Sequence, residues 1–460
     1  MRMRMMGAIA LGLAGIAGGA ALTAQEPSRA PAAAPNPAPA SIVTYIHAGH
    51  LIAVPGQPVR GASTVIVRDG RIAEIRDGFA EPDGGARVVD LRDHYVLPGL
   101  IDMHVHLLGI GGDPTRARLE ALTRDEQDDL LTGIVNARVT LQAGFTTVRD
   151  LGGDARSIRA LRDAIERGDV AGPGIVNAGR MISVTGGHGD ATNGVRMEFA
   201  DAIRPHEISI CDGPDDCRRA VRQQVALGAQ VIKFAATGGV LSNVSGGLGR
   251  AMTPEEMRAI VETAHALGRR VAAHAHAREG VEAALAAGVD TIDHGTFLTD
   301  ETIRLFRARG AWLVPTMLAP ATALEMARAG LFPPAVRPKA EEAAAAAIES
   351  HRRAIAGGVR IAFGTDTGVS RHGDNAREFA LMVRAGMTQM AAIRAATVDA
   401  AEALGRRDRI GSIEPGRDAD IIAVAADPVA DVTVLERVRF VMRRGVVHRL
   451  GGRIQGVPAN

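Results

Sequence analysis

Histidine and aspartate side chains recur at the ends of short apolar runs, where they could bind metal ions. The first of these runs, at 100–106, ends in His104 and His106. Alternate residues of a strand point to the same side, so we expect both imidazoles on one face. Imidazole and carboxylate groups are good ligands for zinc and similar divalent ions. The sequence therefore predicts a metal site, to which later runs contribute His274, His276, His294 and Asp366.

A lysine, Lys233, lies inside the apolar run VIKFA at 231–235. Burying an ammonium group is costly unless the charge is neutralised or paired. Burial also lowers the pKa of a lysine and frees its amine to react. Reaction with carbon dioxide gives a carbamate, an anion whose two oxygens can bridge two cations. With four histidines and one aspartate, it would hold two metal ions about 3.5–4 Å apart and leave an open position for hydroxide.

Between residues 98 and 405, apolar runs alternate with helical stretches such as 254–268 and 279–288. Eight β/α repeats predict an α/β fold, a TIM-like (β/α)8 barrel with its active site at the carboxyl ends of the strands. A doubly wound sheet is the alternative, although it more often has five or six strands. The runs cover 100–106, 145–150, 174–182, 231–235, 270–276, 290–295, 311–316 and 360–366.

Both flanks of this region are rich in β-branched residues. Residues 42–54 and 64–76 alternate in strand style, and Asp69-Gly70 is a hairpin turn signal. Residues 420–424 and 437–448 are also strand-like, with a turn at Gly445. We expect the flanks, 41–97 and 406–460, to form one small β-sandwich beside a barrel at 98–405.

The N-terminus has the pattern of a secretory signal peptide. Residues 1–24 place two arginines before an uncharged Gly/Ala/Leu/Ile run, with a cleavage point after Ala24. An uncleaved anchor is the alternative. Residues 25–40 contain five prolines among alanines, which is typical of a linker. We therefore expect a periplasmic or secreted protein with no membrane association after cleavage.

Composition and cysteine content narrow the function further. The net charge is +1 and only 3% of residues are aromatic, which argues against a nucleic-acid binder. The two cysteines, Cys211 and Cys217, are close in sequence, and an exported protein is exposed to oxidants. We expect them to form a disulfide; two free thiols are the alternative.

As a set, these motifs resemble the metal-dependent amidohydrolase superfamily. The resemblance rests on LPGLIDMHVH at 97–106, on Lys233, on His274 in VAAHAH, on His294 in IDHG and on Asp366 in FGTD. It extends through GSIEPGRDADIIAV at 411–424 and covers residues 42–447. Three further segments are similar to the binuclear prolidase-like and carboxypeptidase-like peptidases, a group that includes ochratoxin-cleaving enzymes: 185–190 (TGGHGD), 232–242 and 271–280.

The resemblance implies a role for each residue. His104, His106 and Asp366 would bind one metal ion and His274 and His294 the other, with N-carboxylated Lys233 as the bridge. The ions are expected to be zinc. His188 and His276 would face the substrate, and Asp366 would also carry a proton. Strand geometry does not separate His274 from His276 as the ligand, and the resemblance favours His274.

We therefore predict an exported amidohydrolase that uses metal-activated hydroxide on a small-molecule amide or dipeptide and releases a C-terminal amino acid. Substrates would include Xaa-Pro dipeptides, C-terminal residues of peptides or N-acyl amino acids of the ochratoxin type. We also expect a homo-oligomer. The alternatives are lactone or phosphotriester hydrolysis at the same centre and a non-catalytic binding scaffold. Ala277 replaces the glutamate typical of mononuclear deaminases, which argues against deamination.

Overall fold

The computed structural model describes residues 42–455, apart from 112–115, 117–119, 121–122, 243–246 and 333–335. The predicted signal peptide (1–24) and linker (25–40) lie outside the described residues, so their assignment stays a prediction. Among the residues that are described, no helix is both long enough and apolar enough to cross a membrane.

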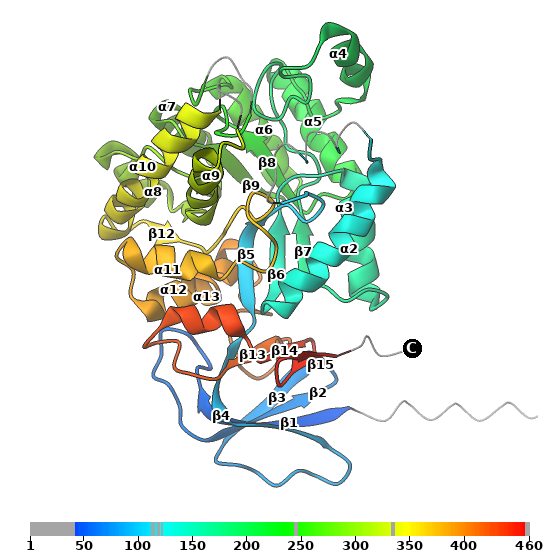
Figure 1. Ribbon diagram of the computed structural model, residues 1–460, viewed down its shortest axis with the longest axis vertical. Helices are drawn as coiled ribbons and strands as arrows, with labels where there is room; N and C mark the ends of the chain where they lie inside the picture. The colour runs from blue at the N-terminus through cyan, green and yellow to red at the C-terminus, as the bar shows by residue number, and fades with distance from the viewer. Residues whose placement is uncertain are drawn as a thin grey trace, which may run out of the picture. The chain divides into compact units, whose positions relative to one another are not determined.

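Each of the eight predicted apolar runs contains a β-strand. Figure 1 labels β5 to β9 and β12 among them. The strands form two parallel sheets, one with the order β5-β6-β7 and the other with the order β12-β11-β10-β9-β8. Their bounds are β5 Leu100–Val105, β6 Phe145–Asp150, β7 Gly174–Asn177, β8 Val231–Ala235, β9 Arg270–Ala275, β10 Thr291–His294, β11 Trp312–Val314 and β12 Arg360–Ile361.

Hydrogen bonds join the two parallel sheets at both edges. Beyond β7, the Ile182 amide donates to the Lys233 carbonyl of β8 at 2.8 Å. At the other edge, Met103 of β5 donates to the carbonyl of Phe363, which follows β12, at 2.9 Å. A doubly wound sheet leaves two open edges, so these bonds argue against that alternative.

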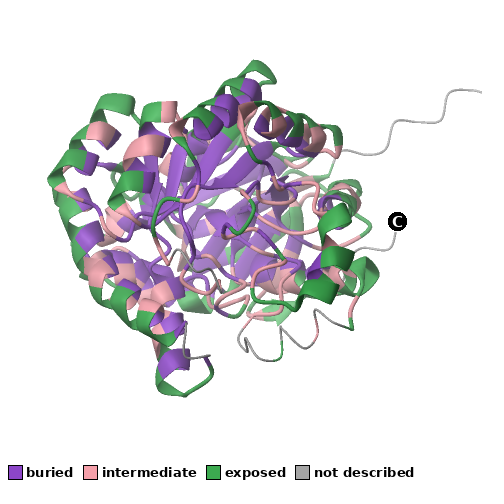
Figure 2. Ribbon diagram, turned by 90° about the horizontal axis from the view of Figure 1, so that it is seen from above, coloured by how far each residue is buried: buried purple, intermediate pink, exposed green. Residues whose placement is uncertain are grey.

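Helices separate the strands and cover the outside of the parallel sheets. The helical pattern at 254–268 is confirmed as α6 (Pro254–Ala266), which begins with a capping box between Thr253 and Glu256. The pattern at 279–288 is confirmed as α7 (Arg278–Ala287). Figure 2 shows buried residues on the inner strands and exposed residues on the outer helix faces. The remaining α-helices of the described residues are α2 Glu126–Gln142, α3 Ala155–Arg167, α4 Met197–Ile203, α5 Pro214–Ala226, α8 Asp300–Arg309, α9 Leu318–Arg328, α10 Arg337–Ala356, α11 Arg377–Arg384, α12 Gln389–Ala395 and α13 Val398–Ala403, with 3-10 turns η1 Arg204–His206 and η2 Val432–Arg437.

The two flanks contribute strands to one mixed eight-stranded sheet, with the order β16-β15-β14-β13-β4-β1-β2-β3. The link between the chain ends is the antiparallel pairing of β4 with β13, in which Pro98 faces Ile421. Both predicted turns are confirmed: Asp69-Gly70 joins β2 to β3, and Gly445 lies between β14 and β15. The bounds are β1 Val43–Leu51, β2 Ser63–Arg68, β3 Arg71–Asp77, β4 Arg87–Pro98, β13 Ile421–Val424, β14 Phe440–Arg443, β15 Val446–Leu450 and β16 Arg453–Ile454.

Candidate metal centre

The side chains that the sequence analysis singled out meet at the carboxyl ends of the parallel strands. They line one cavity of about 270 Å³. Because carboxyl ends of parallel strands share one edge, residues far apart in sequence meet there. The residues concerned are His104, His106, His188, Lys233, His274, His276, His294 and Asp366.

One side of the centre, which we call the aspartate half, consists of His104, His106 and Asp366. Oδ1 of Asp366 lies 3.1 Å from Nε2 of His106 and 3.4 Å from Nε2 of His104. The two Nε2 atoms are 3.3 Å apart. Nδ1 of His106 donates to the carbonyl of Gly152 at 3.1 Å, which leaves its Nε2 lone pair directed at the site.

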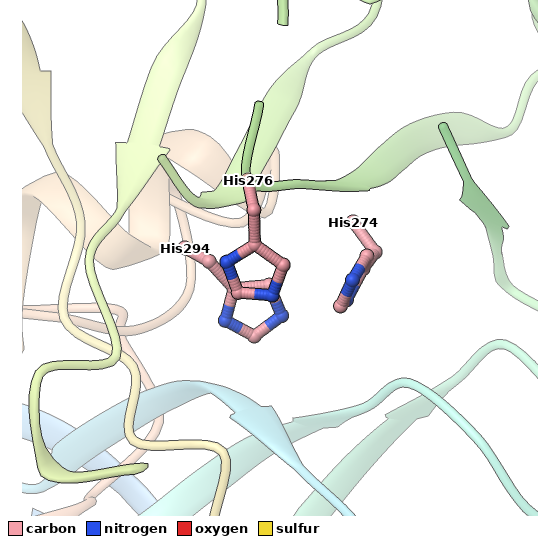
Figure 3. A group of neighbouring side chains, drawn as sticks. All are labelled: His274, His276 and His294. Atoms are coloured by element: carbon pink, nitrogen blue, oxygen red, sulfur yellow. The ribbon is translucent and has the colours of Figure 1, made fainter. Parts of the chain in front are cut away.

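The other side, which we call the histidine half, consists of His274, His276 and His294 (Figure 3). One ligand atom from each imidazole lies within 4.8 Å of the other two. Nδ1 of His294 lies 2.7 Å from the Thr316 hydroxyl, and Nδ1 of His276 lies 2.7 Å from the Thr296 hydroxyl. These contacts leave the lone pairs of both Nε2 atoms able to bind a cation.

The geometry does not separate His274 from His276 as a ligand. Nε2 of His274 lies 3.3 Å from the Gly238 carbonyl and donates to it, so its Nδ1 stays available. The ring of His276 stacks on that of His294, with centroids 4.8 Å apart. Both assignments therefore remain open, and that of His274 continues to rest on the resemblance.

Lys233 lies on β8, the last strand in the order of the five-stranded sheet, and an aspartate that the sequence analysis did not consider holds it. The Lys233 ammonium donates to Oδ2 of Asp293 at 2.6 Å. Oδ1 of Asp293 accepts from Arg149 at 2.8 Å, and Arg149 also donates to the Met103 carbonyl at 2.6 Å. Both Arg149 and Asp293 are buried inside strands. This network holds the Lys233 side chain in place. It also links β6, which carries Arg149, and β10, which carries Asp293, to Met103 of β5.

Burial keeps most of these imidazoles neutral. It lowers the pKa of His104, His274 and His294 well below the usual value. Burial also lowers the pKa of Lys233, although Asp293 acts in the opposite direction. A neutral imidazole is the form that binds a metal ion, so the site is prepared for ligation near neutral pH.

His106 is the exception in this set. Its burial disfavours the charged ring, but the Asp366 carboxylate outweighs burial and raises the pKa of His106. Asp366 supplies the carboxylate of the aspartate half, and a carboxylate is a good ligand for a divalent ion.

Three residues of the centre have strained backbones. His294, Thr316 and Asp366 have positive φ angles of 77°, 48° and 59°. Such angles are unfavourable for residues other than glycine and are often found at functional sites. His294 is the last residue of β10, whereas Thr316 and Asp366 follow β11 and β12, and all three line the cavity. The aspartate half is braced further by buried Asp102, whose carboxylate accepts from the His104 amide at 3.0 Å and the Thr365 amide at 3.1 Å.

The predicted substrate residues lie beside the histidine half. The ring of His188, in the segment after β7, stacks on that of His274 with centroids 4.3 Å apart. Burial lowers the pKa of His188 to about 4 and that of His276 to about 3. Near neutral pH each therefore acts as an uncharged imidazole with one N–H donor. The facing wall of the cavity is apolar and includes Met181, Val240, Leu241, Pro320 and Val369.

Two histidines that the sequence analysis did not place at the site support the centre. His351 of α10 is buried, lines the cavity and donates to the His294 carbonyl at 2.6 Å. His372 donates to the His106 carbonyl at 3.2 Å. No local pattern separates these two from a helix or loop histidine, because their partners lie far away in sequence.

The donor set fits metal ions. Lone pairs of neutral imidazoles and one carboxylate converge. Nδ1 of His104 lies 3.5 Å from Oδ2 of Asp293, and its Nε2 faces His106 and Asp366. Two sets of possible ligands share His294: His274 with His276, and His104 with Asp366. Nitrogen and oxygen donors in such sets suit zinc and similar ions.

Comparisons with known proteins agree with the family resemblance found in the sequence. Residues 95–448 match the Amidohydrolase family. The chain is 32% identical to ochratoxinase of Aspergillus niger over 425 residues, which cover 87% of this chain and 84% of that protein. A solved Xaa-Pro dipeptidase with methionine bound in its active site is 40% identical, with a TM-score of 0.85, and the match covers 88% of this chain and 100% of that one. The solved A. niger ochratoxinase has a TM-score of 0.78 at 29% identity and coverages of 89% and 96%.

Proposed function

The chain belongs to the amidohydrolase family, and on that basis we propose that it is an exported, binuclear metal-dependent enzyme that cleaves amides and releases a C-terminal amino acid. It is a hydrolytic enzyme that acts on C–N bonds, in the prolidase-like group that includes ochratoxinase. The observation that supports the finer proposal is the convergence of His104, His106, Lys233, His294 and Asp366 on one cavity.

In this proposal His104, His106 and Asp366 hold one ion and His274 and His294 the other, with a carboxylated Lys233 between them. Lys233 is supported as the bridge by its position on β8, inside the same cavity as both halves. The carbamate keeps one N–H, which can donate to Asp293 as the amine does. When bound, the two ions, expected to be zinc, lower the pKa of a water so that it can attack near neutral pH.

Asp366, His188 and His276 have separate roles in the cleavage of the amide. Asp366 accepts a proton from the attacking water and passes it to the departing amine nitrogen, as general base and then general acid. His188 and His276 donate hydrogen bonds to the developing oxyanion or to the carboxylate of the substrate. The apolar wall around Val240, Leu241 and Val369 receives a hydrophobic substituent.

Two further parts of the proposal concern architecture and location. The bonds across both edges of the parallel sheets support closure into a (β/α)8 barrel, and the mixed sheet formed by both flanks supports the β-sandwich beside it. The charged start and apolar run of residues 1–24 support export to the periplasm or the medium.

A paired-substrate assay tests the substrate class. Purified, zinc-loaded protein is given Xaa-Pro dipeptides and N-acyl phenylalanines, each with a free or an amidated C-terminal carboxylate, together with lactones. We expect the free acids to be cleaved with a much higher kcat/KM than their amidated forms. Equal rates on both forms would remove the carboxylate requirement, and faster cleavage of lactones would favour lactone hydrolysis.

A further inference from the structure

The disulfide between Cys211 and Cys217 encloses a short acidic loop beside the segment that carries His188. The structure confirms the predicted bond, and both cysteines are fully buried. None of residues 211–217 lines the cavity. The loop can therefore influence the site only through the residues that it touches.

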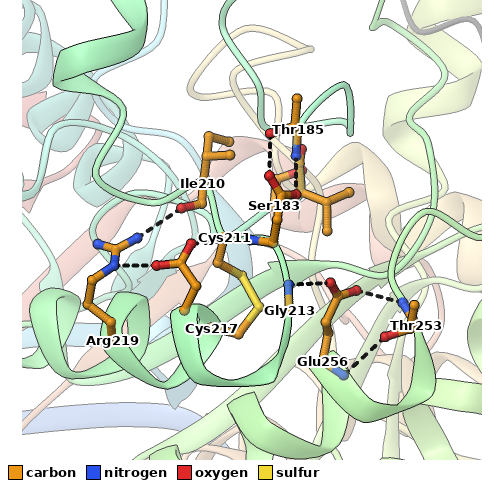
Figure 4. The surroundings of a disulfide bond; sticks show 12 residues. Ser183, Thr185, Ile210, Cys211, Gly213, Cys217, Arg219, Thr253 and Glu256 are labelled. Carbon is orange, nitrogen blue, oxygen red and sulfur yellow. Dashed lines mark hydrogen bonds and ion pairs between the residues drawn. A yellow bond between two sulfur atoms is a disulfide. The ribbon is translucent and has the colours of Figure 1, made fainter.

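Figure 4 shows that the disulfide loop pairs with the chain just before His188. The amide of Cys211 donates to the Ser183 carbonyl at 2.8 Å. The carboxylate of Asp212 accepts twice from Thr185, from its amide at 3.1 Å and from its hydroxyl at 2.6 Å. Asp212 thus holds the start of the His188 segment by a charged, two-point contact.

From Thr185 to His188 the segment is a tight, self-bonded turn. The Gly187 amide donates to the Val184 carbonyl at 2.9 Å, and the Gly189 amide donates to the Ser183 hydroxyl at 3.1 Å. A side chain added at Gly239 would come within 2.2 Å of Nδ1 of His188, so the imidazole packs directly on that glycine. A shift at the base of this turn would therefore move the ring of His188 against His274.

The far side of the disulfide loop is anchored to two helices. The Gly213 amide donates to Glu256 at the start of α6 at 2.8 Å. Arg219 of α5 donates to Asp216 at 2.6 Å and to the Ile210 carbonyl at 3.0 Å. The loop that carries Asp212 is therefore held by α5 and α6 on the side away from Thr185.

We propose that Asp212 is a positioning residue for His188 and that the Cys211–Cys217 disulfide holds Asp212 in place for this purpose. Asp212 and Thr185 are both exposed, so water competes for their hydrogen bonds. An exposed hydrogen bond contributes little unless its partners are already ordered. The cross-link supplies that order, because it restricts the chain on both sides of the loop. This inference rests on the proposed function of His188 as a substrate-binding residue.

The test compares Asp212→Ala with Asp215→Ala in the zinc-loaded protein. Asp215 belongs to the same loop, but its side chain is 99% exposed and, among the residues that the structure describes, pairs only with Arg218. For Asp212→Ala we expect KM for a cleaved dipeptide to rise roughly three- to tenfold, as expected for loss of a charged hydrogen bond. We expect kcat to change less than twofold. Asp212→Asn, which keeps one acceptor, should recover part of the loss, and Asp215→Ala should match the unaltered protein.

Hydrogen exchange provides a readout that does not depend on turnover. Amides of residues 183–190 should exchange faster in Asp212→Ala, and in the double variant Cys211→Ser/Cys217→Ser, than in Asp215→Ala. Unchanged exchange and unchanged KM in Asp212→Ala would overturn the proposal, even if the double variant fails to fold. Faster exchange with an unchanged KM would overturn the role assigned to His188 in binding while keeping the structural link. If no amide is cleaved by any form, the proposed function fails, and the exchange data still decide whether Asp212 orders this segment.

Discussion

The two halves of the candidate metal centre orient their imidazoles by different means. In the aspartate half, His106 is fixed by a backbone carbonyl and by the Asp366 carboxylate. In the histidine half, His276 and His294 are oriented by the hydroxyls of Thr296 and Thr316, with no carboxylate in the set. The carboxylate, and with it the proton transfer that we propose, belongs to the aspartate half, whereas the imidazoles of the histidine half depend on uncharged contacts.

The largest expected effect comes from the residue between the halves. Lys233→Ala removes the proposed bridge and leaves the buried Asp293 carboxylate without one of its two cationic partners, with Arg149 still paired to it. We expect loss of at least one metal ion and a fall in kcat/KM of roughly 10³-fold or more, the upper range for removal of one preorganised group. Metal analysis and steady-state kinetics measure both, and short carboxylic acids should restore part of the activity. Two bound ions with full turnover in this variant would show that Lys233 is not the bridge.

A smaller change tests the dependence of the histidine half on hydroxyl contacts. Thr316→Val keeps the shape of the side chain but removes the partner of His294 Nδ1. Loss of such an outer contact costs roughly 10–100-fold in metal affinity or activity. Thr322→Val is the matched control, because its buried hydroxyl has no partner among the described residues. Metal affinity, measured by competition with a chelator, should fall only in Thr316→Val. An equal fall in both variants would point to general destabilisation.

The choice between His274 and His276 is tested within the same half. If His276 holds the substrate, His276→Ala should raise KM by roughly tenfold with little change in kcat, because a contact equally strong in both states acts on binding. Metal content should remain the same as in His265→Ala, a control on the exposed outer face of α6. Loss of one metal ion from His276→Ala would instead assign His276 as the ligand.

The smallest effect concerns the buried support of the histidine half at low pH. Burial lowers the pKa of His351 to about 4 from its ordinary value of 6.5, so between these values the unfolded chain binds more protons. The free energy of unfolding should therefore fall as the pH decreases through this range, by about 2 kcal/mol at pH 5 from this residue alone. Urea unfolding of metal-free protein at pH 7 and pH 5 measures it. His351→Gln should lose correspondingly less stability between the two pH values, and an identical loss would contradict the assignment.

The sequence predicted which side chains gather at the cavity better than it predicted what holds them there. The sequence could place His104, His106 and His294 at one site because each lies at the end of an apolar run, and the carboxyl ends of parallel strands meet. Asp293 and Arg149 also stand in such runs, but their burial and pairing depend on which strands lie across the sheets. His351 joins the centre from a helix 57 residues after His294, a contact that only packing creates. Strand periodicity likewise carries no sign of the positive φ angle of Thr316.

Zinc titration of the metal-free protein tests the central claim most directly. Bound zinc and the rate of hydrolysis of a Xaa-Pro dipeptide or N-acyl phenylalanine are followed together as zinc is added. The account predicts that turnover rises until two zinc ions are bound per chain and then levels off, since both halves and Lys233 act on one amide. Full activity with a single ion per chain, or undiminished activity after all metal has been removed, would contradict it.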